Sequence, residues 1–161
     1  MPMSINRASA APVVHMPGGG ESTSLMGMTI VCKVTGQQTG GQFSLVEITE
    51  PTGSGSPAQY NQVISMACYM LEGTMTLRFG DETQEFGPGS FAYLPAGTAY
   101  QTSNQSGAPV KYLLFSTPAG MDEYFIEAFD WIQRQPAWPP EDMSELLALR
   151  TRHHFYDAPA G

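Results

Sequence analysis

GSGSPAQYNQVISMACYMLEG, at residues 53–73, and GSFAYLPAGTAYQTSN, at residues 89–104, are the two stretches that decide the fold of this chain. Each begins at a glycine and carries short apolar and aromatic runs between turn-forming residues. Gly73 and Gly97 suit turns that need a positive φ, and Pro95 presets the backbone of a turn. The two stretches therefore predict short β-strands joined by tight turns.

Runs of the same kind continue on both sides of these stretches. The dipeptide Gly80-Asp81 is a hairpin signal, and the segment at 51–57 has the proline, glycine and serine content of a loop. About ten short strands at regular spacing predict an antiparallel β-sandwich or β-barrel. We expect strands at residues 24–35, 42–49, 59–65, 67–71, 74–79, 84–86, 90–94, 99–103 and 110–116.

The two ends of the chain differ from this β-rich middle. Residues 1–24 are small, polar and rich in glycine, and predict an arm in which Val13-Val14-His15 is either an edge strand or part of a disordered tail. Apolar side chains at helical spacing predict a helix at 121–133, and Pro139 to Asp142 start a second one. We expect the first helix to pack on the barrel or to cover its mouth. The expected organisation is an N-terminal arm at 1–24, a barrel at 25–120 and a helical extension at 121–161.

The composition argues against several classes of function. Charged residues make up 14% of the 161 residues and the formal net charge is −8. Such a surface repels phosphate backbones and offers no basic patch to an anionic membrane, so neither nucleic acid nor a membrane is an expected partner. No apolar run reaches the ~18 residues of a membrane span, and the N-terminus lacks a secretory pattern, so we expect a cytoplasmic protein. Cys32 and Cys68 lie in apolar runs without a spacing motif, and we expect two reduced, buried thiols.

The spacing of glycine and proline in the two stretches resembles the paired motifs of the cupin superfamily. In that family the first motif places His-x-His five residues after a glycine, followed by a glutamate and a closing glycine. The second motif places Pro-x-Gly five residues after a glycine, followed by a histidine and an asparagine. The corresponding positions here are, in order, Gly53, Gln59, Asn61, Met66 and Gly73, and then Gly89, Pro95, Gly97, Tyr100 and Asn104.

The likeness is to small single-domain cupins of the quercetin-dioxygenase-like and polyketide-cyclase-like kind. It implies an all-β fold, the cupin double-stranded β-helix or jelly-roll barrel, with C-terminal helices. Cupins of this size commonly pair, so the resemblance also implies a homodimer.

In the family, three histidines and one glutamate of these motifs hold a divalent metal inside the barrel. The resemblance places that site at Gln59, Asn61, Met66 and Tyr100, where all four donors have been replaced. Amide oxygens are weak neutral donors, a thioether favours Cu(I), and a phenol must lose a proton whose pKa is about 10. We therefore expect no metal and no other cofactor. The remaining histidines are expected to be surface or packing residues: His15, His153 and His154.

What remains is a cavity lined by protein groups alone. Because side chains alternate along a strand, one face of each motif strand is expected inside the barrel. The residues on that face are Gln59, Asn61, Met66, Cys68, Met70, Tyr100, Thr102 and Asn104. Glu47, on a preceding strand, is a further candidate for the interior. Amides, a phenol and soft apolar walls suit an aromatic or polyketide-like small molecule.

Three functions fit this pocket. The first is a metal-independent isomerase, cyclase or dehydratase, with Tyr100 as general acid or hydrogen-bond donor, Gln59 and Asn61 around the developing oxyanion, and Glu47 as the nearby candidate base. The second is a non-catalytic protein that binds a small molecule. The third is a quercetinase-like, metal-dependent dioxygenase with unusual ligands, which the replaced donors disfavour.

Overall fold

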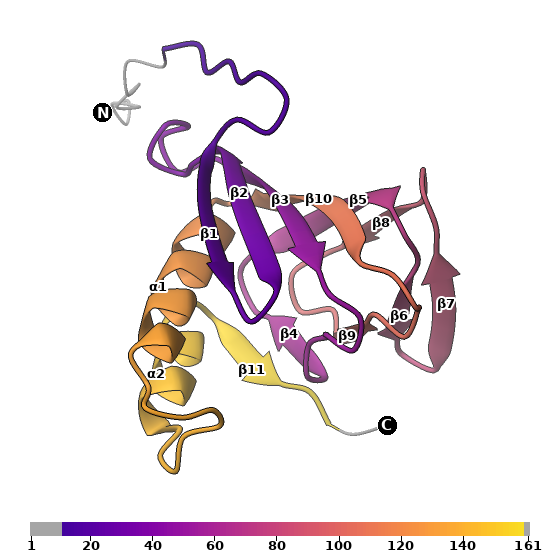
Figure 1. The fold of residues 1–161 in the computed structure, drawn as a ribbon, viewed down its shortest axis with the longest axis vertical. Helices are drawn as coiled ribbons and strands as arrows, with labels where there is room; N and C mark the ends of the chain where they lie inside the picture. The colour runs from indigo at the N-terminus through magenta and orange to yellow at the C-terminus, as the bar shows by residue number, and fades with distance from the viewer. Residues whose placement is uncertain (1–10, 160–161) are drawn as a thin grey trace, which may run out of the picture.

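The computed structural model describes residues 11–159 as two antiparallel β-sheets that face each other, with two helices packed along one side (Figure 1). The strands are β1 (Glu21–Leu25), β2 (Met28–Val34), β3 (Ser44–Glu50), β4 (Gln59–Asn61), β5 (Ser65–Glu72), β6 (Met75–Phe79), β7 (Glu82–Phe86), β8 (Phe91–Leu94), β9 (Tyr100–Ser103), β10 (Val110–Thr117) and β11 (Phe155–Asp157); the helices are α1 (Met121–Gln133) and α2 (Ser144–Arg152). The strand orders are β1-β2-β3-β10-β5-β8 and β11-β4-β9-β6-β7. The jelly-roll barrel with C-terminal helices expected from the sequence is thus confirmed.

Alternating side chains along the strands form the core between the two sheets. In β3 every second residue from Ser44 to Glu50 is buried, and the residues between them are partly exposed. β10 pairs with both β3 and β5, and its Tyr112 and Leu114 are likewise buried. From the other sheet, β6 contributes the buried Leu77. Burying one large apolar side chain contributes roughly 1.5–3 kcal/mol, so this interior holds the two sheets together.

Two motif glycines occupy turns that other residues enter only with strain. Gly73, between β5 and β6, has φ +76°, and a Cβ there would lie 2.5 Å from the carbonyl oxygen of Pro109. Gly97, between β8 and β9, has φ +85°, and its N–H donates to the carbonyl oxygen of Asn61 at 2.7 Å. The motif spacing therefore reflects the turns of the barrel, and it identifies a fold more than a function.

The C-terminal extension closes one side of the barrel. α1 begins after Gly120 and has Asp122 and Glu123 in its first turn, where the helix dipole favours negative charge. Phe125 and Phe129 of α1 face the barrel interior, which agrees with a helix covering the mouth. α2 packs on α1, and β11 then returns to pair with β4 (Figure 1).

Near the N-terminus the structure differs from the expected boundaries. The strand expected at 24–35 is two strands, β1 and β2, joined by a hairpin in which Met26 and Gly27 have positive φ. β1 therefore takes in residues of the expected arm. Val13-Val14-His15 form no strand, although His15 Nε2 lies 3.0 Å from the carbonyl oxygen of Lys33.

Two further boundaries and one additional strand differ from the expectation. The strand expected at 59–65 ends at Asn61, because the Asn61 side chain accepts hydrogen bonds from the N–H groups of Val63 and Ile64 and turns the chain. The second helix starts only at Ser144, whose N–H is bonded by Asp142. β11 was not expected, because three residues carry too little pattern to indicate a strand.

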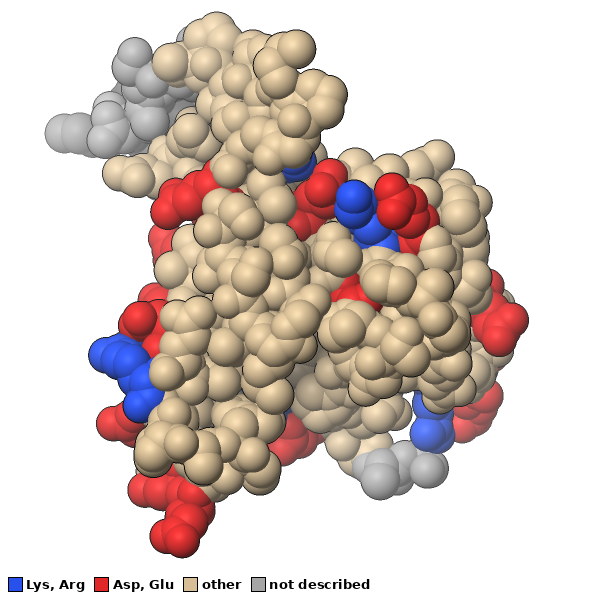
Figure 2. All heavy atoms as spheres, in the orientation of Figure 1, with Lys and Arg blue, Asp and Glu red and all other residues tan. Residues whose placement is uncertain are grey.

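The surface carries scattered charge. On the face shown in Figure 2, acidic side chains spread around the molecule, and the few basic ones mostly lie beside them. None of the helices in the described residues is long and apolar enough to cross a membrane. This face therefore has no concentrated basic region.

Candidate functional site

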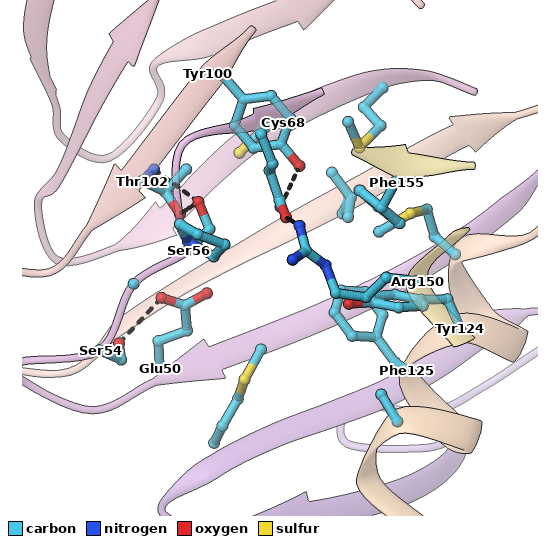
Figure 3. Close-up of a pocket in the computed structure, with 18 of the residues that line it drawn as sticks. Glu50, Ser54, Ser56, Cys68, Tyr100, Thr102, Tyr124, Phe125, Arg150 and Phe155 are labelled. Atoms are coloured by element: carbon cyan, nitrogen blue, oxygen red, sulfur yellow. Dashed lines mark hydrogen bonds between the residues drawn. The ribbon is translucent and has the colours of Figure 1, made fainter. Parts of the chain in front are cut away.

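A cavity of about 420 Å³ lies between the two sheets and is bordered by α1 and α2. Its lining comes from both sheets and from both helices (Figure 3). Most lining side chains are apolar or contain sulfur, among them Met28, Met66, Met75, Leu77, Phe125 and Phe129. This size and this wall are typical of small-molecule pockets.

Glu50 supplies a buried carboxylate to the wall and points into the cavity (Figure 3). Tyr112 donates a hydrogen bond to its Oε1 at 2.6 Å. The Ser54 hydroxyl lies 3.1 Å from Oε2 but only 2.7 Å from the carbonyl oxygen of Pro51. Because a hydroxyl has one proton, Ser54 donates it to the closer acceptor, the carbonyl oxygen of Pro51. Oε2 is therefore the oxygen of Glu50 with spare capacity to accept a proton.

A chain of hydrogen bonds runs along another side of the cavity (Figure 3). Gln59 Nε2 lies 3.1 Å from the hydroxyl oxygen of Tyr100, and Arg150 Nη2 lies 3.1 Å from Gln59 Oε1. Arg150 also donates from Nη1 to Asp157 Oδ1 at 2.8 Å. Since its side chain is only 13% exposed, α2 places a largely buried positive charge at the barrel wall.

The phenols around the cavity stay protonated at neutral pH. Burial raises the pKa of Tyr100 to about 12, and the Gln59 hydrogen bond opposes this rise only in part. Burial also raises the pKa of Tyr112 well above its usual value, with the adjacent Glu50 carboxylate adding to the effect. Burial also raises the pKa of Tyr124, and the nearby Arg150 guanidinium opposes this rise only in part. The cavity therefore offers neutral hydroxyl donors beside one carboxylate.

Two smaller polar groups complete the wall. Thr102 Oγ1 lies 3.2 Å from Ser56 Oγ, which also accepts a hydrogen bond from the Thr102 N–H. Burial, and then the Glu50 carboxylate, raises the pKa of the Cys68 thiol to about 12. Cys68 is therefore a neutral wall residue rather than a nucleophile. Cys32 is buried outside this wall, and both thiols are free.

Most residues expected inside the barrel are there, but not all of them reach the cavity. Asn61 and Asn104 are buried and bonded to backbone groups, so they hold loops in place. Met70 is fully buried in the core. The residues of the expected set that line the cavity are Gln59, Met66, Cys68, Tyr100 and Thr102.

Glu47 is the expected site residue that the structure places elsewhere. It lies on the outer side of β3, where its carboxylate is 3.9 Å from Lys33 Nζ. The buried positions of β3 begin at Ser44, and the count by twos from there reaches Glu50. Sequence reasoning missed Glu50 because it assigned the opposite face of this strand to the interior. It missed Arg150 because nothing in the pattern of α2 singles that residue out.

The four positions of the family metal site do not fit a divalent metal. Both polar atoms of Asn61 and of Gln59 are bonded to protein groups, Met66 offers a thioether, and the Tyr100 phenol holds its proton strongly. Within residues 11–159, no cluster of three or more His, Cys, Asp or Glu side chains has the arrangement of a metal site. His153, at the C-terminal end of α2, instead lies 3.4 Å from Glu127 of α1. This donor set disagrees with the metal that the fold family implies.

Comparison with known proteins gives one family and many similar folds. The family model described as "Cupin domain" matches residues 45–116. No curated protein matches the sequence. Among solved structures, the polyketide cyclase RemF from Streptomyces resistomycificus is similar with a TM-score of 0.57 and 20% identity, over 66% of this chain and 79% of that one.

Two further similar structures differ more in size or sequence. A sugar phosphate isomerase from Silicibacter pomeroyi has a TM-score of 0.50 and 24% identity, over 56% of this chain and 59% of that one. This chain thus matches less than two thirds of that protein. KdgF from a Halomonas species has a TM-score of 0.54 and 14% identity, over 64% of this chain and 92% of that one. At these identities the likenesses establish the fold alone.

Proposed function

We propose, from the match of the cupin-domain model to residues 45–116, that this chain is a metal-independent enzyme acting on a small aromatic or polyketide-type carbonyl compound. The reaction is a proton transfer that leads to isomerisation, cyclisation or dehydration. One observation carries the proposal: the carboxylate of Glu50 and the protonated phenol of Tyr100 line the same apolar cavity. A base and a hydrogen-bond donor in one enclosed pocket suit enolate chemistry.

Glu50 is the base in this proposal. Its Oε2 has spare acceptor capacity, because Ser54 bonds more closely to Pro51. Tyr112 holds the other oxygen and fixes the plane of the carboxylate. A proton on the carbon next to a substrate carbonyl therefore moves to Oε2, which leaves an enolate on the substrate.

Tyr100 and Arg150 stabilise the charge that this transfer creates. The Tyr100 hydroxyl donates to the enolate oxygen, and the guanidinium of Arg150 lies behind it through Gln59. Fixed donors in a pocket with little water stabilise such an oxyanion far better than solvent does. Asn61 was also expected in this role, but its side-chain amide is hydrogen-bonded to backbone groups and does not take part.

The proton returns to the substrate to complete each reaction. Return from Glu50 to another carbon of the enolate gives an isomer. In a cyclisation the enolate carbon bonds to a second carbonyl carbon of the same molecule, and the new alkoxide takes the proton from Glu50. In a dehydration the enolate expels the hydroxyl group from the neighbouring β-carbon, and this hydroxyl takes the proton from Glu50, so that water leaves and a C=C bond forms. Each route returns the Glu50 side chain to the state in which it began.

The wall favours an aromatic or polyketide-type ligand over a sugar phosphate. Methionine and phenylalanine side chains pack well against flat rings. In the part of the chain that the structure describes, Arg150 is the one cationic side chain of the lining, and Gln59 and Asp157 already bond it. A phosphate dianion would find few donors here. Similarity to structures named a polyketide cyclase and a sugar phosphate isomerase supports a cyclase- or isomerase-like role.

A non-catalytic binding protein is the second candidate. The observation that favours it is the hydrogen bonding of Glu50, which already has Tyr112 and Ser54 as neighbours. A carboxylate held in this way also serves as a fixed acceptor for a bound ligand. A metal-dependent dioxygenase is disfavoured by the donor set, and elemental analysis of purified protein tests it. Stoichiometric iron, nickel, manganese or copper would overturn the metal-independent proposal.

Deuterium exchange separates the enzyme from the binding protein. The probe is 1-tetralone, a bicyclic aromatic ketone whose α-protons exchange slowly in neutral water. We expect the protein to accelerate incorporation of deuterium at carbon 2 at least roughly tenfold, as general bases do. Glu50→Gln should return the rate to background, and the matched control Glu47→Gln should keep it. Binding of 1-tetralone without faster exchange would favour the binding protein, and equal exchange by Glu50→Gln would exclude Glu50 as the base.

A further inference from the structure

We propose that Arg150 and Asp157, both outside the segment that matches the cupin model, are positioning residues that fix Tyr100 as a hydrogen-bond donor to the cavity. The site then takes ligands that present a carbonyl or enolate oxygen at Tyr100. A catalytic role for this donor rests on the proposed function. The preference for such ligands depends only on the contacts among Tyr100, Gln59, Arg150 and Asp157.

Three of these residues lie side by side on adjacent strands. In the five-stranded sheet, Asp157 of β11 is the direct partner of Gln59 of β4, and Gln59 is the direct partner of Tyr100 of β9. Directly opposed residues of antiparallel strands project to the same face of a sheet. Arg150 reaches this row from α2 and bonds to both Asp157 and Gln59. The row is therefore tied together from two separate elements of the C-terminal extension.

The direction of each hydrogen bond follows from the chemistry of Arg150. A guanidinium has donors only, so Gln59 must turn its carbonyl oxygen toward Arg150. The amide nitrogen of Gln59 then faces the Tyr100 hydroxyl and donates to its oxygen. Since the phenol oxygen accepts in this contact, its own proton points elsewhere. Among the described residues, none accepts a hydrogen bond from this hydroxyl. Because Tyr100 lines the cavity, its proton is available to a ligand there.

Asp157 keeps Arg150 in this geometry. The carboxylate of Asp157 is 2.8 Å from Nη1, and the side chain of Arg150 is almost wholly buried while that of Asp157 is largely exposed. A buried guanidinium needs a partner, because an unpaired buried charge is costly. Without Arg150, the amide of Gln59 is free to rotate and to accept the Tyr100 proton. The phenol would then no longer be available to a ligand.

The test compares two ligands of the same shape in the intact protein. The ligand 1-tetralone has a carbonyl oxygen, and tetralin is the corresponding hydrocarbon without an acceptor. Ligand-observed NMR gives both dissociation constants, and their ratio, tetralin over 1-tetralone, reports the hydrogen bond. We expect this ratio to fall roughly tenfold in Tyr100→Phe, which is the size of one lost hydrogen bond.

The same ratio tests Arg150 directly. We expect it to fall severalfold in Arg150→Met, and to change little in Arg150→Lys, because lysine is also a donor only. Asp157→Asn should lower it in the same direction by less. The matched control is Arg152→Met, on the same helix, whose side chain is exposed and pairs with Glu127. In the double variant Arg150→Met with Tyr100→Phe, the ratio should equal that of Tyr100→Phe alone.

The outcomes separate this inference from the proposed function. A ratio that depends on Arg150 and Tyr100 supports the inference even where the protein catalyses no deuterium exchange. A ratio that Arg150→Met leaves unchanged overturns the inference even where exchange is fast. Loss of both ligands in parallel in Arg150→Met would indicate a purely structural role and would also overturn it.

Discussion

Tyr112 donates a 2.6 Å hydrogen bond to Glu50 inside the barrel, from β10 to the neighbouring β3. Both side chains are buried, and both line the cavity. A buried carboxylate is tolerated when hydrogen bonds satisfy it, and this phenol supplies the shortest one that Glu50 receives. The same hydrogen bond therefore stabilises the barrel and positions the Glu50 carboxylate in the cavity.

Tyr112→Phe tests how far the barrel depends on this bond. The change removes the hydroxyl and leaves Oε1 of Glu50 buried without that donor. We expect the free energy of unfolding to fall by about 2 kcal/mol, the scale of a hydrogen bond to a charged group. Urea unfolding measures it. Tyr69→Phe, the same change at an exposed tyrosine, should cost little, and an equal loss in both variants would contradict the assignment.

Alkaline pH should destabilise the folded protein through Tyr100. Its pKa is about 12 in the folded state, against about 10 in an unfolded chain, so the unfolded state loses the phenolic proton first. The stabilisation is complete below about pH 10 and is lost as the pH rises to about 12, amounting to about 2–3 kcal/mol. Denaturant unfolding between pH 9 and pH 11.5 should show a smaller decline for Tyr100→Phe than for wild type. Identical slopes would mean that the phenol ionises freely in the fold.

Cys68 should react slowly although it lines a cavity. Its thiol pKa of about 12 lowers the thiolate fraction roughly a thousandfold relative to a free cysteine. In a Cys32→Ala background, we expect modification by a disulfide reagent at pH 8 to be orders of magnitude slower in buffer than in urea. Saturating 1-tetralone should slow it further, because the ligand would occupy the space next to the thiol. Fast labelling that the ligand leaves unaffected would place Cys68 outside the binding space.

The barrel could be predicted well from the sequence because the motif glycines occupy turns that the backbone requires. Gly73 and Gly97 are needed by the backbone, and their spacing fixes the strands between them. Alternation within one strand was equally informative, since Met66 and Cys68 share a face of β5 and both line the cavity. These signals are local, and local signals survive in the sequence whatever the barrel binds.

The site was harder to predict because it depends on register and on distant segments. A shift of one residue along β3 exchanges its inner and outer faces. For this reason Glu47 was expected in the interior, whereas the structure places Glu50 there. Arg150 and Asp157 reach Gln59 only through the packing of α2 and β11, which no periodicity encodes. Asn61 occupies a family ligand position, yet its buried amide serves the backbone. Such roles follow from tertiary contacts rather than from residue type.

The homodimer implied by the family resemblance remains a prediction, and the outer face of the six-stranded sheet is where we expect it. Tyr69 of β5 is the direct partner of Phe91 of β8, and Tyr93 lies on the same outer face; all three are exposed. A contiguous, uncharged aromatic surface of this kind marks an interface, and a second copy of a chain with net charge −8 avoids repulsion best where it meets uncharged side chains. Analytical ultracentrifugation at micromolar concentrations should show a dimer for wild type. Phe91→Lys and Tyr93→Lys should each shift it to monomer by placing charge in the contact, whereas Leu147→Lys, at an exposed position of α2, should leave it dimeric. A monomeric wild type, or dimers that both sheet variants retain, would exclude this face as the interface.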